Sequence, residues 1–376
     1  MAQIQPNDRF GINEIPATDI YTTSSLYDYV WGPLEQEIES AENIYFSPTG
    51  VFYKIGIEYL PDTSGLNLSI NHKVYRLSST REIVLSRKKN IQKGVLIGGV
   101  DYNTSIAKLA KQSSKYELDV QEGRATPIDS LDLRGASDAN GFAYLEGTME
   151  EVDEISTKLL GSEVDVEIFI GENGSETNIK NLTTSEIDLL HIATHGFYYS
   201  NKMSTKRHSV DILFKDMYLH EISENIELID EDKMMTRSGL ILAGANNVIR
   251  QIKIPNGVED GILYADEISS LNLSSVEILV LSACQSGLGD IASSEGVFGL
   301  QRGFKLSGAG SIIMSLWKVN DVATKFLMTE MYNNLLKGQM KREALVNAQM
   351  ALRTCENGIF DKPEFWAAFI LLDGIN

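Results

Sequence analysis

The sequence predicts an α/β protein built around a largely parallel sheet, and three observations support this fold class. Short apolar runs alternate with longer segments of helical character along most of the 376 residues, which is the pattern of α/β sandwiches. The hydrophobic fraction of 43% is enough to bury a substantial core. Several apolar runs also end in small residues or beside a cysteine or histidine, as sheets with an active edge do.

The predicted elements follow one another in this alternating order. The strands are expected at residues 43–46, 95–100, 166–170, 187–193, 239–243, 277–283, 311–316 and 367–372. The helices are expected at residues 26–40, 106–110, 148–160, 296–306, 321–336 and 341–353. The last two helices carry apolar residues at i, i+3 and i+4, the spacing of one buried helix face.

A stretch rich in glycine, serine and aspartate, residues 121–143, predicts a long connection between two α/β units. We therefore divide the chain into an N-terminal extension (1–24), a first α/β unit (25–135) and a second α/β unit (140–376). A second irregular stretch, residues 198–237, follows His195 closely. It is either a lid or binding loop or a plain surface excursion.

The composition excludes several classes of protein. A formal charge of −19 argues against a nucleic-acid partner, because a phosphate backbone would be repelled. Two cysteines exclude a disulfide-stapled secreted scaffold and favour a reducing compartment. The sequence lacks a signal-peptide core, a membrane-length apolar run and zinc-ligand spacing. We therefore expect a soluble, cytoplasmic protein that is not bound to a membrane and has no metal or cofactor.

A histidine and a cysteine each follow a buried-strand pattern. One apolar run ends at His195 and a second ends at Cys284. If the two strands are neighbours, both side chains meet at the carboxyl edge of the sheet, where open α/β sheets bind ligands. A free thiol, with a pKa of ~8.5, is mostly protonated at neutral pH, and a nearby imidazole can take its proton. The pattern predicts Cys284 as a nucleophile toward an acyl carbon and His195 as its base.

The glycine after the histidine adds a candidate oxyanion hole. Gly196 has no side chain, so its N–H can approach a carbonyl oxygen closely, and the N–H of Cys284 can act beside it. Such donors contribute ~3–4 kcal/mol each where mutation has tested them. The residues alone leave an alternative open, in which Cys284 is a small buried apolar residue and His195 a hydrogen-bonded core residue.

Several segments of the chain, in order, resemble the CHAT family of caspase-like peptidases, which are often attached to tetratricopeptide repeats. The central pair is HIATHG (191–196) and LSACQSGLG (281–289). Further similar segments are WGPL (31–34), IYFSPTGV (44–51), LEGT (145–148) with Glu151, RSGLILAGAN (237–246), GILYADEI (261–268), EG (295–296), SLWKVND (315–321) and FWAAF (365–369). Independent motifs in the right order make coincidence implausible.

The resemblance implies a caspase-like three-layer sandwich in which residues 25–135 form a degenerate lobe and residues 140–376 carry the catalytic centre. It implies a cysteine endopeptidase with Cys284 as nucleophile and His195 as base. Family members are often effectors of bacterial defence or signalling systems, with a regulatory partner or a tetratricopeptide-repeat protein. One departure is visible: the family commonly has Glu-Thr after the cysteine, where this chain has Gln285 and Ser286.

The segment from Trp317 to Asp321 resembles the element that the related separases use for the P1 pocket. By that resemblance Asp321 would receive an Arg or Lys side chain before the scissile bond, and Trp317 would wall the pocket. A carboxylate in a partly desolvated pocket pairs well with a cation. The alternatives are that Asp321 is the N-cap of the predicted helix and that Trp317 is a core residue.

Two further residues are expected to be structural, and two other functions remain open. His191 is expected to be a hydrogen-bonded residue of the sheet, the alternative being that it supports the dyad or lines the cleft. Cys355 is expected to be a structural or partly exposed cysteine. The first other function is a catalytically silent module for protein recognition. The second is a thiol hydrolase or transferase acting on a non-peptide acyl substrate.

Overall fold

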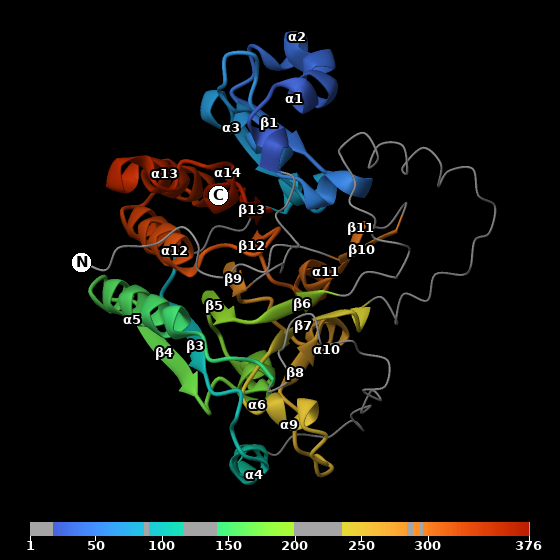
Figure 1. Ribbon diagram of the computed structural model, residues 1–376, viewed down its shortest axis with the longest axis vertical. Coiled ribbons are helices and arrows are strands. Elements are labelled where there is room, and N and C mark those ends of the chain that lie inside the picture. Colours follow the sequence, from blue (N-terminus) through green and yellow to red (C-terminus); the bar gives the residue numbers. More distant parts are fainter. Residues whose placement is uncertain are drawn as a thin grey trace, which may run out of the picture.

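The computed structural model describes residues 18–85, 90–115, 141–198, 235–283, 289–292 and 296–375 (Figure 1). Cys284 therefore lies outside the described residues, as do most of the connection at 121–143 and of the stretch at 198–237. Within the described part of the chain, no helix is both long and apolar enough to cross a membrane.

An eight-stranded sheet forms the centre of the molecule, with the strand order β1-β2-β13-β12-β9-β5-β3-β4. All neighbouring strands are parallel except β12 and β13, which are antiparallel. The strands of this sheet are β1 (Asn43–Phe46), β2 (Lys73–Arg76), β3 (Lys93–Val100), β4 (Asp165–Gly171), β5 (Leu189–Thr194), β9 (Ile278–Ala283), β12 (Ser311–Ser315) and β13 (Phe369–Leu372). The prediction of an α/β fold with a largely parallel sheet is confirmed.

The two strands at the centre are entirely buried. Every residue of β5 and β9 is buried, and their apolar side chains lie in the main hydrophobic cluster. Continuous apolar runs of this kind are what a parallel strand covered on both faces requires. The runs that predicted these strands were therefore reliable signals.

Helices cover both faces of the sheet, with α5, α12 and α13 on one side and α6, α10 and α11 on the other (Figure 1). The helices of the described residues are α1 (Ser25–Val30), α2 (Glu35–Ile38), α3 (Leu68–Asn71), α4 (Ile106–Lys115), α5 (Glu146–Leu160), α6 (Glu176–Asn181), α9 (Asn246–Ile249), α10 (Ala265–Ser269), α11 (Leu300–Leu306), α12 (Asp321–Leu336), α13 (Lys341–Thr354) and α14 (Pro363–Trp366). The arrangement is a three-layer sandwich.

Two predicted helices are interrupted or shortened in the structure. The helix expected at 26–40 is interrupted at Gly32 and Pro33, where a 3-10 turn separates α1 from α2; proline lacks an N–H for the helical ladder. The helix expected at 296–306 begins only at Leu300. Its first residues form β11 (Gly296–Gly299), which pairs with β10 (Gly289–Ala292) in an antiparallel hairpin, so a long-range pairing overrides the helical pattern.

A small antiparallel sheet follows β5 and was only partly predicted. It consists of β6 (Gly196–Tyr198), β7 (Ser238–Ile241) and β8 (Ile262–Tyr264). Gly239 permits this packing, because a Cβ there would lie 2.8 Å from the Leu263 carbonyl oxygen and 2.8 Å from the Phe197 ring. The sheet holds the chain that leaves β5 close to the carboxyl end of the central sheet.

The first segment of the chain contributes strands to the same sheet as the second. β1 and β2 lie at one edge, whereas β3 lies between β5 and β4. The predicted boundary between 135 and 140 falls outside the described residues, so the division into an extension, a degenerate lobe and a catalytic unit stays a prediction.

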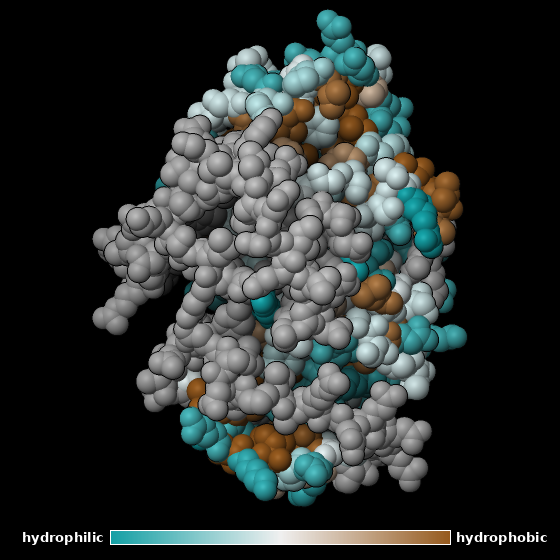
Figure 2. Space-filling view, turned by 90° about the vertical axis from the view of Figure 1, so that its right-hand side faces the viewer, coloured by the Kyte–Doolittle hydropathy of each residue, from teal (hydrophilic) through white to brown (hydrophobic). Residues whose placement is uncertain are grey.

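The segment 18–85 exposes several large apolar side chains, and Figure 2 shows hydrophobic surface at this upper end of the molecule.

Candidate functional site

The strands that precede His195 and Cys284 are parallel neighbours. In the register of β5 and β9, Thr194 is paired with Ala283. His195 is the next residue after β5, and Cys284 follows Ala283 in the sequence but lies outside the described residues. The proposed meeting of His195 and Cys284 requires that their strands be neighbours, and β5 and β9 are neighbours. The role of each residue in a dyad stays a prediction.

His195 is half-buried and packs against two aromatic rings. Its ring centroid lies 5.1 Å from that of Tyr102 and 5.5 Å from that of Phe142. Burial lowers the pKa of His195 below its ordinary value of 6.5, and the charge of Lys318 lowers it too, against the opposing effects of the hydrogen bond to Ala143 and of the charge of Asp321. The imidazole is thus favoured in its neutral, basic form at neutral pH.

A backbone carbonyl fixes the orientation of this ring. His195 Nε2 lies 2.9 Å from the carbonyl oxygen of Ala143. Because a carbonyl oxygen can only accept, Nε2 must carry the proton, and Nδ1 is then the unprotonated nitrogen of the neutral ring. The sequence pattern missed this group, since a backbone carbonyl leaves no signature in the sequence. It also missed Phe142 and Tyr102, which were not recognisable among other apolar positions.

Hydrogen bonds anchor the end of β5 just before the histidine. The Thr194 hydroxyl donates to the carbonyl of Ile241, so the Tyr102 hydroxyl must donate in its 3.0 Å contact with Thr194. The amide of Ile241 donates to the carbonyl of His195 at 2.9 Å. These bonds hold His195 between the central sheet and the small sheet.

The N–H group of Gly196 is oriented so that it can donate a hydrogen bond outside the small sheet. It is paired with Leu240 in β7, and the bond from Ile241 N–H to the His195 carbonyl makes this a non-hydrogen-bonded pair. The N–H of Gly196 consequently points away from β7. Its role as an oxyanion donor, together with the amide of Cys284, stays a prediction.

Asp321 lies in the first turn of α12, and the alternative that it is the N-cap is wrong. The N-cap is Asn320, whose side-chain oxygen accepts from Val322 N–H and Ala323 N–H at 3.0 and 3.2 Å. Asn320 has the extended backbone of a cap, with φ −66° and ψ 132°. Both residue types cap helices well, so the sequence alone does not choose between adjacent positions.

Asp321, in the first turn of α12, lies close to the start of α5. A Cβ on Gly147, in the first turn of α5, would lie 3.1 Å from the Asp321 Cβ, so the two helices approach closely here. The pKa of Asp321 is raised, first by desolvation and then by the charge of Glu151, while Lys318 and His195 lower it. Asp321 and His195 thus influence each other electrostatically.

Trp317 is buried, with 8% of its surface exposed. Its indole N–H donates to the carbonyl of Glu364 at 3.0 Å, and its ring lies 5.8 Å from that of Tyr21. These contacts agree with the alternative that Trp317 is a core residue. A part for Trp317 in a substrate pocket stays a prediction.

A buried polar cluster lies beneath the ends of β5 and β9. His191 Nδ1 lies 3.1 Å from the Tyr332 hydroxyl, and His191 Nε2 lies 3.1 Å from Glu151 Oε1. The other carboxylate oxygen of Glu151 accepts a 3.0 Å hydrogen bond from Ser282 in β9. The expectation that His191 is a hydrogen-bonded sheet residue is confirmed by the contact with Tyr332.

The second cysteine lies far along the chain from this cluster. Cys355 is half-buried, and its thiol donates to the carbonyl of Leu352 at 3.0 Å. Burial raises its pKa, and the charge of Glu356 raises it further. A raised pKa keeps the thiol protonated, in agreement with the structural role expected for it.

Three carboxylates elsewhere lie close enough to hold a cation: those of Glu176, Glu259 and Glu267. The Lys180 ammonium contacts all three, at 2.7, 2.9 and 2.9 Å. The Lys180 ammonium therefore occupies the place in which a metal ion would contact these carboxylates. The expectation that the protein needs no metal or cofactor stays a prediction.

Comparison with known proteins identifies the family. A family model described as CHAT domain matches residues 22–374. The mouse (Mus musculus) protein "Tetratricopeptide repeat protein 28" is 31% identical over 111 residues, which are 30% of this chain and 4% of that protein. The human (Homo sapiens) protein of the same description is 30% identical over 115 residues, again 4% of its length.

Two solved structures are also similar. The first is described as the crystal structure of the Arg-specific cysteine proteinase gingipain R, with 9% identity and a TM-score of 0.45 over 91% of this chain and 66% of that one. The second is a complex of Porphyromonas gingivalis RgpB pro- and mature domains, with 11% identity and a TM-score of 0.45 over 95% of this chain and 69% of that one. Because the family model spans most of its residues, the chain belongs to the CHAT domain family.

Proposed function

We propose that the chain is a cysteine endopeptidase that cleaves protein substrates through Cys284 and His195. The orientation of His195 is the observation that carries this proposal. Its Nε2–H is held by the Ala143 carbonyl at the carboxyl end of β5, which directs Nδ1 to act as the base. The neighbouring strand β9 ends one residue before Cys284.

The chemistry follows from these groups. The Cys284 thiol transfers its proton to His195 Nδ1, and the thiolate attacks the carbonyl carbon of a peptide bond. The N–H groups of Gly196 and Cys284 hold the resulting oxyanion. His195 then protonates the leaving amine, and a thioester remains on Cys284. Water hydrolyses that thioester, His195 takes a proton from the water, and the free enzyme returns.

The substrate preference rests on Asp321. A carboxylate beside the catalytic histidine can pair with the cation of an Arg or Lys side chain before the scissile bond. Asp321 is exposed at the helix start and lies within electrostatic reach of His195.

The change Asp321→Ala should abolish the preference for basic P1 residues in a peptide library while cleavage at other residues persists. Glu330→Ala, on the same helix, is the matched control; equal loss in both variants contradicts the assignment.

A catalytically silent module and a thiol hydrolase of non-peptide acyl groups are the two competing functions. An acyloxymethyl ketone separates the first from the proposal, since it labels Cys284 only if the thiol is activated. Failure of wild-type protein to react, while Cys284 is shown to be reduced, would favour the silent module. Labelling without cleavage of any peptide library would favour the acyl hydrolase.

The biological setting belongs to the same proposal. The family resemblance supports an effector role in bacterial defence or signalling, in the cytoplasm, with a regulatory partner. The matches to tetratricopeptide-repeat proteins support a repeat protein as that partner. Co-purification of the chain with candidate repeat proteins, followed by a cleavage assay with and without each one, tests both ideas.

A further inference from the structure

We infer that Glu151 is a positioning residue, which ties the ends of β5 and β9 together so that His195 and Cys284 keep a reactive separation. The inference rests on the proposed function, because it assigns a role within the same site. Glu151 itself touches neither reacting atom; it acts through His191 and Ser282.

The contacts of Glu151 join the two strands that carry the proposed dyad. From α5, Oε2 accepts a hydrogen bond of 3.0 Å from Ser282 in β9, while Oε1 lies 3.1 Å from His191 Nε2 in β5. Ser282 is two residues before Cys284, and His191 is four residues before His195. A single carboxylate therefore bridges the two strands just below their ends.

The register places these groups on one face of the sheet. Ser282 is paired with Ala193, and residues 191 and 193 of β5 lie on the same face because side chains alternate along a strand. The side chains of His191 and Ser282 thus point from the same face toward α5. His195 continues that face at the end of the strand, so a shift of either strand at the bridge is passed along the strand to the site.

The three residues of the bridge are buried. The exposed fractions are 3% for Glu151, 0% for His191 and 8% for Ser282. Burying a carboxylate is costly, and apolar residues of similar volume often stabilise a protein more than a buried ion pair does. Packing of the three elements alone does not require a carboxylate at this position.

The contact between Glu151 and His191 is also incompletely satisfied. Glu151 Oε1 and His191 Nε2 are 3.1 Å apart but not aligned as a hydrogen bond, so neither atom has a hydrogen-bond partner among the described residues. The buried pair of Arg76 and Glu58 differs, because Arg76 donates to both carboxylate oxygens at 2.9 and 2.7 Å. Buried polar atoms without a partner are rare in folded proteins and need an explanation, of which a role in catalysis is one.

The same helix supports the site at two further points. Ala143, just before α5, orients His195, and Gly147 in its first turn lies against Asp321. Glu151 is one turn further along, where its charge raises the pKa of Asp321. The beginning of α5 is thereby a common support for the base, the proposed pocket acid and the two strand ends.

The test is the rate at which iodoacetamide alkylates Cys284, measured by mass spectrometry that separates this cysteine from Cys355. The reaction needs no substrate, so it reports the dyad alone. We expect Glu151→Met, which keeps the volume but removes both contacts, to slow alkylation by roughly 100-fold, the effect of a 1 Å misplacement. Peptide cleavage should lose kcat by a similar factor with KM unchanged.

Matched variants separate positioning from a structural role. Glu151→Gln can still accept from Ser282 and reach His191, so we expect it to stay within about tenfold of wild type. Glu154→Gln, on the exposed face of the same helix where Glu154 bonds Thr329, should change nothing. Thermal unfolding of each variant shows whether the fold is retained. Wild-type alkylation and kcat in a folded Glu151→Met variant would overturn the inference.

If Glu151→Met does not fold, Ser282→Ala removes one arm of the bridge at little cost in volume. A loss of about tenfold in alkylation is expected for it, and an unchanged rate would overturn the inference. Failure of the proposed function has a different signature: wild-type Cys284 would then react no faster than Cys355.

Discussion

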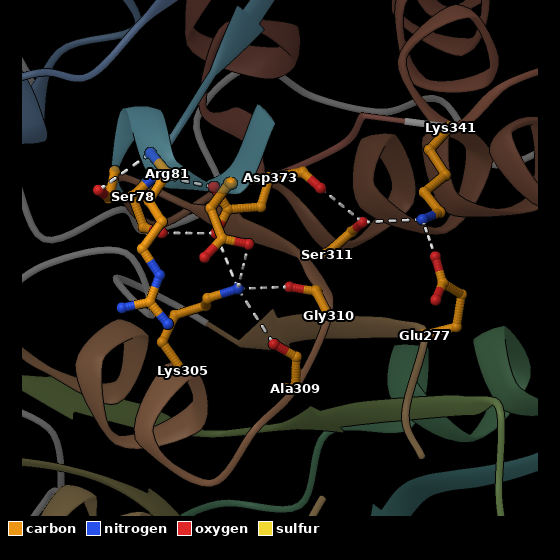
Figure 3. A network of polar contacts seen from close by, with 11 residues as sticks. Ser78, Arg81, Glu277, Lys305, Ala309, Gly310, Ser311, Lys341 and Asp373 are labelled. Atoms are coloured by element: carbon orange, nitrogen blue, oxygen red, sulfur yellow. Dashed lines mark hydrogen bonds and ion pairs between the residues drawn. The ribbon is translucent and has the colours of Figure 1, made fainter. Parts of the chain in front are cut away.

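The two ends of the central sheet differ in how their charged side chains are paired. At their amino ends, shown in Figure 3, each carboxylate has its own ammonium group. Lys341 donates to Glu277 and to the Ser311 hydroxyl, and Lys305 lies 2.8 Å from Asp373. Lys305 also donates to the carbonyls of Ala309 and Gly310. The charges at this end are paired and hydrogen-bonded.

The carboxyl ends of β5 and β9 show the reverse. Among the described residues at this end are the carboxylates of Glu151 and Asp321, and the ammonium group of Lys318, whose charge acts on Asp321, is exposed. Glu151 also has a buried oxygen without a hydrogen-bond partner among the described residues. The same sheet thus places satisfied charges where it needs stability and poorly compensated charges beside His195. Perturbed pKa values, such as the raised pKa of Asp321, are typical of functional sites.

The largest effect is expected from breaking the satisfied end. Lys341→Met leaves Glu277 buried without its cation, which should lower the free energy of unfolding by about 3–5 kcal/mol. Denaturant unfolding measures this loss. Lys325→Met, which breaks the surface contact with Glu150, is the control and should change the stability little. Equal effects in both variants would contradict the distinction between the two ends.

A third cluster, in which one cation serves several carboxylates, sharpens the comparison. Asp260 lies beside Glu259 and Lys180, and burial, with the nearby Glu267 and Glu259, raises its pKa to about 6 from the ordinary 3.8. A raised pKa in the folded state means that the stability is full below pH ~4 and falls as the pH rises toward 6.

Asp260→Asn removes this titration while its side-chain oxygen can still accept from Ile262 N–H. The variant should therefore be more stable than wild type at pH 8, by about 1–3 kcal/mol at ~1.4 kcal/mol per pKa unit. The advantage should disappear near pH 4. Unfolding free energies at both pH values decide the matter, and an equal difference at both would count against the raised pKa.

The smallest effect concerns the aromatic cover of His195. Phe142→Ala admits water to the ring, so its pKa should rise toward the ordinary value of 6.5. Because the base must be neutral, the acid limb of kcat/KM should move to higher pH together with that pKa. Phe142→Leu keeps the apolar cover and should leave the limb in place. Identical pH profiles for the two variants would show that desolvation by Phe142 does not set the base.

The elements that the sequence predicted well are those whose own residues decide their structure. β1 and α12 have the predicted bounds, and β9 begins one residue later than expected, because continuous apolar runs and helical spacing act locally. β2, with its mixed residues Lys73–Arg76, was missed. β11 was taken for a helix, since only its pairing with β10 shows that it is a strand.

The candidate site divides in the same way. His195 and Gly196 could be found from the end of an apolar run, and the parallel pairing of β5 and β9 agrees with that reasoning. The Ala143 carbonyl could not, because every residue has such a group and only the fold selects this one. Glu151 lies one turn inside a helix, and its contacts with β5 and β9 arise from helix packing that no local pattern encodes.

The central claim is that Cys284 and His195 form a working peptidase centre, and substrate profiling by mass spectrometry tests it most directly. Wild-type protein and Cys284→Ala would each be incubated with the same protein mixture, and the new amino termini compared. The account predicts new termini with wild type alone, preceded mainly by Arg or Lys. The same new termini from both proteins, at the same rate, would contradict it.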